Sequence, residues 1–276
     1  MASVMAALVL IAACAAPAMG VPRFRPRTAG ATPGPTMACD TWTGAALCSV
    51  LPGGVTELVL NKYGGGAMQI PNHYLTGQFS MDMKLPAGNS GGTATTFYLL
   101  DSITPTNKDP RHSEVDIEFF GNTTGNPMLF ATNIFCGGFQ NLAQFRLPFD
   151  PAAAYHNYGF RWNTRQIVWL VDGQPIRVLN RTPRGPWPLL AMKPQSSIWA
   201  TPWTVIKPDF TFGPLKVFTK NFVAQGCPAL KTQVMAAAMV PRCAGAWNAQ
   251  LTPVQLAAYA RLRKATLVVD YGWDKA

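Results

Sequence analysis

Three acidic side chains alternate along one short stretch of this sequence. Glu114, Asp116 and Glu118 are separated by the apolar residues Val115 and Ile117. In an extended strand alternate side chains share a face, so the three carboxyl groups would project together while the apolar residues line the other side. The neighbouring sequence offers no matching row of Lys or Arg. Unpaired like charges this close are destabilising, which indicates that the row has a catalytic use.

The spacing of the two glutamates fits a covalent mechanism on a glycosidic bond. Their Cα atoms would lie about 13 Å apart at roughly 3.3 Å per residue. Side chains leaning inward would bring the carboxyls to about 5–6 Å, near the ~5–5.5 Å that retaining glycosidases need for a nucleophile and an acid. Crowding by like charges raises the pKa of whichever acid holds the shared proton. Glu118 can then act as acid without metal or cofactor, while Asp116 hydrogen-bonds the nucleophile.

A histidine begins the same stretch. His112 shares the face of the three acids, and we assign it to the substrate-binding set. A role in tuning the acids and a purely structural role at the start of the strand are the alternatives.

The elements that must position these acids are strands. The chain has 276 residues, 48% of them hydrophobic and only 13% charged, with 24 Gly and 24 Pro, which predicts an all-β domain with many turns around one core. Alternation predicts a strand over 79–85 with one face buried, and another over 95–100. Two apolar runs, 166–171 and 176–179, flank Asp172-Gly173 and predict a hairpin. Trp169 within it is assigned to the core.

The C-terminal part predicts a small appendage. Thr252-Pro253 is a good helix start, followed by an amphipathic helix over 254–264 and a strand over 266–271. At the other end, residues 1–20 predict a secretory signal peptide, with an uncleaved membrane anchor as the alternative. Residues 21–37, rich in Pro and Gly, predict a disordered lead-in.

Cysteines and charge narrow the setting. Removal of the signal would leave five cysteines, so we expect two bridges and one thiol in an oxidising compartment. Cys39 and Cys48 could close a small loop, Cys227 and Cys243 flank a C-terminal segment, and Cys136 is the expected buried thiol. The net charge of +10 is spread singly along the chain, which argues against nucleic-acid binding. It marks either a solvated basic surface or loose attraction to acidic wall polysaccharides.

The stretch from His112 to Asn122 resembles the active-site strand of family 16 glycoside hydrolases, Glu-x-Asp-x-Glu followed by an aromatic residue and glycine. More particularly, the chain is similar to the plant xyloglucan endotransglucosylase/hydrolases. Further landmarks recur in order between about residues 55 and 273, namely Tyr74–Ser80, Gly91–Tyr98, Thr132-Asn133, Phe149–Pro151, His156–Asn163, Val171–Arg177 and Ser196–Trp199.

The resemblance implies a jelly-roll β-sandwich with an open concave cleft, a catalytic domain over 38–222 and a C-terminal extension over 223–276. It assigns Glu114 as nucleophile, Asp116 as helper and Glu118 as acid/base. Asn133, Trp199 and Trp203 would contact sugar, with core packing as the alternative for both tryptophans. Asn122 would carry an N-glycan. The extension also implies a bridge between Cys227 and Cys243.

The expected function is therefore a secreted, monomeric enzyme of the cell wall (apoplast), with xyloglucan or a related β-glucan as donor and acceptor. A hydrolase of mixed-linkage or β-1,3-glucan is the alternative enzyme, and a catalytically silent wall-binding lectin is the alternative from another class. Several residues depart from the family pattern. Ser113 replaces an aspartate, Ala131 replaces a glutamine, the polar and charged residues expected over 141–144 are lacking, and Trp273 replaces a cysteine.

Overall fold

The computed structural model describes residues 35–40, 47–202, 204–235, 243 and 245–275. The predicted signal peptide, nearly all of the predicted lead-in and Trp203 lie outside these residues. The elements are β1 (Ala38–Cys39), β2 (Cys48–Leu51), β3 (Val55–Asn61), β4 (Gly64–Gly65), β5 (Ala67–Gln69), β6 (His73–Lys84), β7 (Thr93–Asp101), β8 (Ser113–Phe120), β9 (Leu129–Cys136), β10 (Phe139–Phe145), β11 (His156–Trp162), β12 (Gln166–Val171), β13 (Gln174–Asn180), β14 (Met192–Ala200), β15 (Leu215–Ala229), the 3₁₀ turn η2 (Ala246–Asn248), α1 (Pro253–Thr266) and β16 (Leu267–Lys275).

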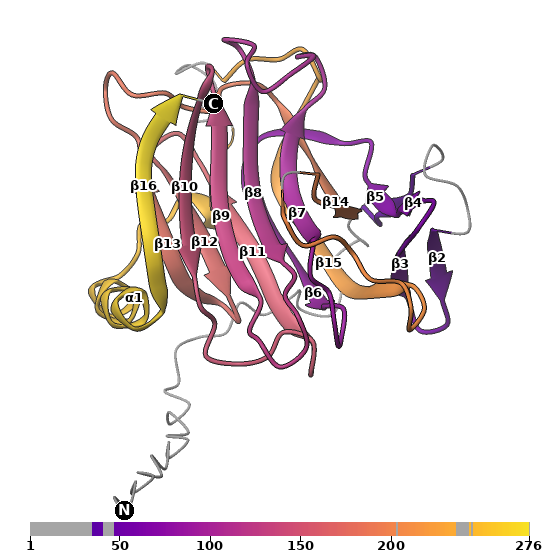
Figure 1. Ribbon diagram of the computed structural model, residues 1–276. Helices are drawn as coiled ribbons and strands as arrows, with labels where there is room; N and C mark the ends of the chain where they lie inside the picture. Colours follow the sequence, from indigo (N-terminus) through magenta and orange to yellow (C-terminus); the bar gives the residue numbers. More distant parts are fainter. Residues whose placement is uncertain (1–34, 41–46, 203, 236–242, 244, 276) are drawn as a thin grey trace, which may run out of the picture.

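The strands form a jelly-roll sandwich, as the sequence predicts. All pairings are antiparallel, and the main order is β13-β12-β11-β6-β14-β7-β8-β9-β10-β16. The sheet folds over, so that β14, β7, β8, β9, β10 and β16 face a second layer containing β13, β12, β11, β6 and β15 (Figure 1). A single pair, Met192 with Tyr74, joins the two layers through β14 and β6.

The core lies between the layers because the strands alternate. On β8, Val115, Ile117 and Phe119 are at most 1% exposed, whereas the residues between them face the other way. Rings from both layers interlock beneath β8, with Phe119 edge-on to Tyr158 at 4.8 Å between ring centroids. Burying aromatic side chains of this size is the largest hydrophobic contribution that one residue makes. The apolar half of β8 therefore anchors its acidic half.

Strand β6 is buried more fully than its sequence predicts. The alternation over residues 79–85 indicates one wet face, yet Gln78 and Ser80 are only 6% and 5% exposed. The reason is that β6 is a central strand, paired with β11 on one side and β15 on the other. The amide of Gln78 is satisfied by donating to Gln225 Oε1 at 2.5 Å, across the β6–β15 pair. Among the described residues the Ser80 hydroxyl has no such partner.

The predicted hairpin is present between β12 and β13. Asp172 and Gly173 have φ of 49° and 76°, the left-handed values that a two-residue hairpin turn of the primed type requires. The predicted strand over residues 95–100 is also present, as β7. Trp169 is fully buried, as expected for a core residue.

Helix α1 starts as predicted and packs by one face, but two of its apolar residues lie on the exposed face. The Thr252 hydroxyl accepts from Gln255 N and the Gln255 side chain accepts from Thr252 N, which makes a reciprocal cap. Val254 and Leu256 are 67% and 47% exposed, and Thr266 is the buried residue of the helix. Within the described part of the chain, no helix has both the length and the apolar character needed to cross a membrane.

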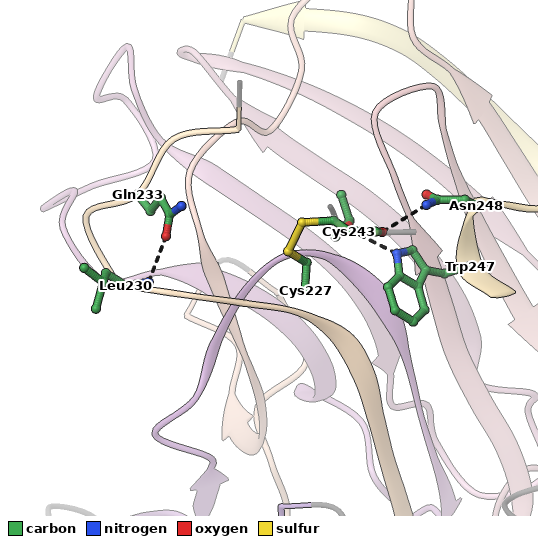
Figure 2. Close-up of a disulfide and its surroundings, with 7 residues drawn as sticks. Cys227, Leu230, Gln233, Cys243, Trp247 and Asn248 are labelled. Carbon is green, nitrogen blue, oxygen red and sulfur yellow. Dashed lines mark hydrogen bonds between the residues drawn. A yellow bond between two sulfur atoms is a disulfide. The ribbon is translucent and has the colours of Figure 1, made fainter. Parts of the chain in front are cut away.

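The C-terminal segment extends the sheet that carries the acids. Strand β16 pairs antiparallel with β10, with two register shifts. Trp273, which stands opposite Asn141, packs against the main core. A disulfide joins Cys227 to Cys243, and Asn248 Nδ2 donates to the Cys243 carbonyl at 3.0 Å (Figure 2). The segment is thus attached to the sandwich by the disulfide near its start and by the pairing of β16 with β10 at its end.

The remaining described cysteines are a second disulfide and one free thiol, as the sequence predicts. A second disulfide joins Cys39 to Cys48. Cys136 is a buried free thiol, and burial raises its pKa to about 12. The thiolate is the reactive form of cysteine, so this residue is inert at neutral pH. The domain boundary proposed between residues 222 and 223 falls inside β15.

One buried arginine ties the C-terminal segment to the rest. Arg177 of β13 is 3% exposed and donates to Thr132 O at 2.9 Å, Thr132 Oγ1 at 3.0 Å and Asn141 O at 2.9 Å. It lies 3.7 Å from Asp270 of β16 and 5.0 Å from the ring of Trp169. Burial lowers its pKa to about 10, so the guanidinium remains charged at neutral pH. Asp270 supplies the opposite charge.

Candidate active site

The three acids lie on the outward face of β8. Direct cross-strand pairing places Glu114 beside Leu100 and Phe135, and Glu118 beside Thr96 and Ala131. Because paired residues on adjacent strands point to the same side, these side chains share the face opposite the core. The alternation read from the sequence therefore places all three carboxyls on the face of β8 opposite the core.

The acids line one open hollow of about 250 Å³. Glu114 and Glu118 are half-buried, and Asp116 between them is 4% exposed. The wall is completed by Thr96, Tyr98, Leu100, Phe135, Ser197 and Trp199. A larger hollow of about 540 Å³ lies beside Asn122, Arg146 and Asp150 and shares no lining residue with the first. Volume alone would point there, but the convergent acids are in the smaller hollow.

The environment of Glu118 holds its carboxyl protonated near neutrality. Burial, and then the charge of Glu114, raise the pKa of Glu118 to about 7. A carboxyl with this pKa can donate a proton at neutral pH and take it back later, which acid/base catalysis requires. The two glutamates thus differ in environment although they belong to one strand.

Asp116 is the most deeply placed of the three. Burial first, and then the charges of Glu114 and Glu118, raise its pKa well above the usual range. Its Oδ2 has no hydrogen-bond partner among the described residues. The backbone carbonyl of Asp116 accepts from Trp169 Nε1 at 2.9 Å, so the core fixes this point of the strand from below.

His112 lies beneath Glu114 and not in the cleft. It is 4% exposed. Its Nε2 is 2.9 Å from Glu114 Oε2, and its Nδ1 is 2.7 Å from Thr104 Oγ1 and 3.2 Å from Asp101 Oδ2. With both ring nitrogens engaged by protein atoms, none faces a sugar. This geometry favours the alternative of tuning the acids over a contact between His112 and the substrate.

The other residues expected to contact sugar or carry a glycan differ in where they lie. Asn133 stands directly opposite Asp116 on β9 and is 3% exposed. Trp199 of β14 lines the hollow. Trp203 lies outside the described residues, so its role stays a prediction. Asn122 follows β8 and is half-buried, with Nδ2 donating to Pro127 O at 3.1 Å.

Several residues around the acids were not expected from the sequence, and Tyr98 and Asp101 are the two that carry charge or a proton. Tyr98 pairs with Asp116 on β7, and burial, with the charges of Glu114 and Asp116, raises its pKa. The predicted strand over 95–100 could have placed it, because Thr96, Tyr98 and Leu100 alternate. Asp101, next to His112, had no such signal because its contact crosses a loop.

One departure from the family pattern has a local explanation. Ser113 stands where an aspartate is usual, and it is 1% exposed. Its Oγ accepts from Leu189 N at 3.1 Å and from Leu190 N at 3.2 Å. The hydroxyl thereby satisfies two backbone donors of the segment leading to β14, which holds the start of β8 in place.

Replacing Asp116 with Asn should weaken activity and stabilise the fold. A group whose folded pKa is raised costs no stability below its unfolded pKa, but it costs stability as pH rises above that value. Asn does not titrate, so its advantage should be absent near pH 3 and present at pH 8. We expect a gain at pH 8 on the order of 1 kcal/mol or more, because ionising the buried Asp116 destabilises the folded state whereas Asn carries no charge, and one unit of pKa corresponds to about 1.4 kcal/mol. Denaturant unfolding at both pH values measures it, and an equal change at both would contradict the raised pKa.

The family described as "Glycosyl hydrolases family 16" matches residues 38–213. Xyloglucan endotransglucosylase protein 1 of Diospyros kaki is 35% identical over 233 residues, covering 81% of this chain and 75% of that protein. A xyloglucan endotransglucosylase/hydrolase of Brassica oleracea var. botrytis is 40% identical over 186 residues, covering 64% of this chain and 61% of that protein.

A solved structure is also similar to this chain in fold and sequence. The Bacillus licheniformis beta-glucanase matches with a TM-score of 0.52 and 27% identity, covering 65% of this chain and 82% of that one.

Proposed function

Because this chain belongs to the glycosyl hydrolases of family 16, we propose that it cleaves the β-1,4-glucan backbone of xyloglucan with retention and passes the cleaved chain to a sugar hydroxyl or to water. The observation that carries this proposal is that β8 presents a protonated glutamate, Glu118, and a second glutamate, Glu114, to one hollow. Glu118 has a pKa raised to about 7 by burial and by Glu114, while Glu114 lies in the same hollow. Such a pair supplies one acid and one nucleophile at neutral pH.

The first step forms a covalent intermediate. A Glu114 oxygen attacks the anomeric carbon, the bond from that carbon to the glycosidic oxygen breaks, and Glu118 gives its proton to the leaving oxygen. Glu118 then takes a proton from the incoming hydroxyl, whose oxygen attacks the same carbon and releases Glu114 as carboxylate. Asp116, protonated in the resting site, donates a hydrogen bond to Glu114 and orients it for attack.

The surroundings suit a polysaccharide. The open side of the hollow is flanked by Trp199, whose indole face can stack on a pyranose ring. Asn133 can hold a hydroxyl, and Trp203 belongs to the same proposal. We also propose an N-glycan on Asn122, secretion to the cell wall, and action as a monomer. The two disulfides support an oxidising compartment.

A labelled-acceptor assay tests the proposal. Purified protein is incubated with xyloglucan and a labelled xyloglucan oligosaccharide. Label in polymer demonstrates transfer, and shortened chains without label demonstrate hydrolysis. We expect transfer, because one named plant relative is a xyloglucan endotransglucosylase and the other a xyloglucan endotransglucosylase/hydrolase.

Two other outcomes are distinguishable in parallel reactions. Turnover of mixed-linkage or β-1,3-glucan but not xyloglucan would favour a glucan hydrolase, the class to which the beta-glucanase of similar fold belongs. Binding to xyloglucan without any bond cleavage would identify a wall-binding lectin. Either result would overturn the proposed substrate or reaction.

A further inference from the structure

The carboxylate of Asp101, at the end of β7, is buried and surrounded by donors. It is 3% exposed. It accepts from Ser113 N at 3.0 Å, Ile103 N at 2.9 Å, and Thr104 N and Oγ1 at 2.8 and 2.7 Å. Burial alone would raise the pKa of Asp101, but His112 and these donors outweigh it and hold the pKa well below the usual range. Asp101 is therefore a fixed negative charge behind the catalytic strand.

The hydrogen bonds around His112 determine its charge. The Thr104 hydroxyl has one hydrogen, and that hydrogen goes to Asp101 Oδ2. Thr104 Oγ1 can then only accept from His112 Nδ1 at 2.7 Å. On the other side, His112 Nε2 faces Glu114 Oε2 at 2.9 Å, and an ionised carboxylate also only accepts. With Glu114 ionised, as its assigned role as nucleophile requires, both nitrogens donate and the ring is an imidazolium.

We propose that Asp101 and His112 form a buried couple that holds a positive charge against Glu114, fixing the orientation of its carboxylate and keeping it ionised for attack. The proposal rests on the assignment of Glu114 as nucleophile. His112 is a positioning residue in this scheme, since it acts on the substrate only through Glu114.

The positive charge of the couple offsets the repulsion among the three acids of the hollow. Glu114 shares its face with Asp116 and Glu118, and Tyr98 is opposite on β7. Without a cation, the shared protons could settle on Glu114 and leave no nucleophile. Burial would lower the pKa of His112, yet its bonds to Asp101 and Glu114 raise that pKa to about 9. The cation therefore persists through the neutral range, next to Glu114 and on the side away from the other two acids.

Histidine NMR tests the charge without requiring turnover. The chain has three histidines, so His112 is identified by the signal lost in His112→Gln. We expect its ring in the wild-type protein to stay protonated at pH 7.5 and to titrate near pH 9. In Asp101→Asn the midpoint should fall by at least one pH unit. A wild-type midpoint at or below about 6.5, the ordinary value, would overturn the proposal even if the enzyme turns over glucan.

Kinetics separate positioning from a structural role. His112→Gln should lower kcat about 10- to 100-fold, as for loss of one hydrogen bond between charged groups, with KM little changed. The acid limb of its pH profile should move to higher pH, because Glu114 is then protonated more easily. A lower unfolding temperature with an unchanged pH profile would instead mean that His112 only anchors the loop, against the proposal.

A second histidine provides a matched control. His156 Nδ1 lies 2.7 Å from Asp172 Oδ2 on the far layer of the sandwich. His156→Gln removes a similar carboxylate–histidine pair outside the hollow, so its pH profile should match the wild type. If the wild type cleaves no glucan at all, the proposed function fails, while the NMR midpoint still decides the charge of His112.

Discussion

Replacing Glu114 with alanine is expected to abolish both transfer and hydrolysis while leaving glucan binding intact. The substitution removes the attacking oxygen, and no described neighbour on the same face can replace it, because Asp116 is 4% exposed and Glu118 is occupied as acid. The loss should be on the order of 10⁴-fold or more in kcat, comparable with removal of the nucleophile from other covalent enzymes. Initial rates on xyloglucan and equilibrium binding to the same polymer measure the two properties separately.

Azide gives this prediction a positive control. The truncated side chain leaves space in the hollow, and a small anion can attack the anomeric carbon from the side where Glu114 stood while Glu118 protonates the leaving oxygen. A glycosyl azide of inverted configuration should then accumulate from an activated substrate. Glu57, which pairs with Lys216 at 3.0 Å on β3, is a matched control, and Glu57→Ala should keep full activity. Retained turnover in Glu114→Ala would refute the assignment.

Replacing Glu118 with glutamine should give the second-largest effect, and one that depends on the leaving group. Cleavage of the polymer needs a proton on a poor leaving group, so kcat/KM should fall about 10²- to 10⁴-fold, the usual contribution of general acid catalysis. An aryl glycoside with an acidic phenol leaves without that proton. Formation of the glycosyl–enzyme from it should therefore be nearly unaffected.

The pH profile carries the same prediction. Glu118 donates only while protonated, so the wild-type rate should be maximal below pH 7 and should fall as pH rises through about 7, the pKa that burial and Glu114 impose. In Glu118→Gln no proton is lost there, and this alkaline limb should vanish from the residual activity. An unchanged limb near pH 7 in the variant would assign the titration to another group.

Much of the acidic strand could be predicted because its pattern is local. Strand periodicity places Glu114, Asp116 and Glu118 on one face without knowledge of any neighbouring strand, and the structure brings all three into one hollow. The Asp172-Gly173 turn and the Thr252 cap are also local. Each depends on residues within a few positions, where backbone preferences decide the outcome.

The partners of these residues could not be predicted, because they depend on strand order and register. Asp101 reaches His112 across a loop, and Gln78 is covered by Gln225, 147 positions away. The sequence also gives no sign that Val254 and Leu256 stay exposed, since helical spacing alone does not say whether a surface is there to cover them. Such contacts follow from the tertiary arrangement and not from periodicity.

Because Asp270 of β16 is the counter-charge of the buried Arg177, the C-terminal strand is needed to neutralise a charge inside the sandwich. A buried cation is tolerated only with its counter-charge, and removing one partner of such a pair is strongly destabilising. A shortened protein ending before β16 would keep a guanidinium beneath the sheet with its hydrogen bonds to Thr132 and Asn141 but with no anion from β16. Anyone trimming this enzyme to a minimal jelly roll must therefore exchange Arg177 for an uncharged residue in the same step.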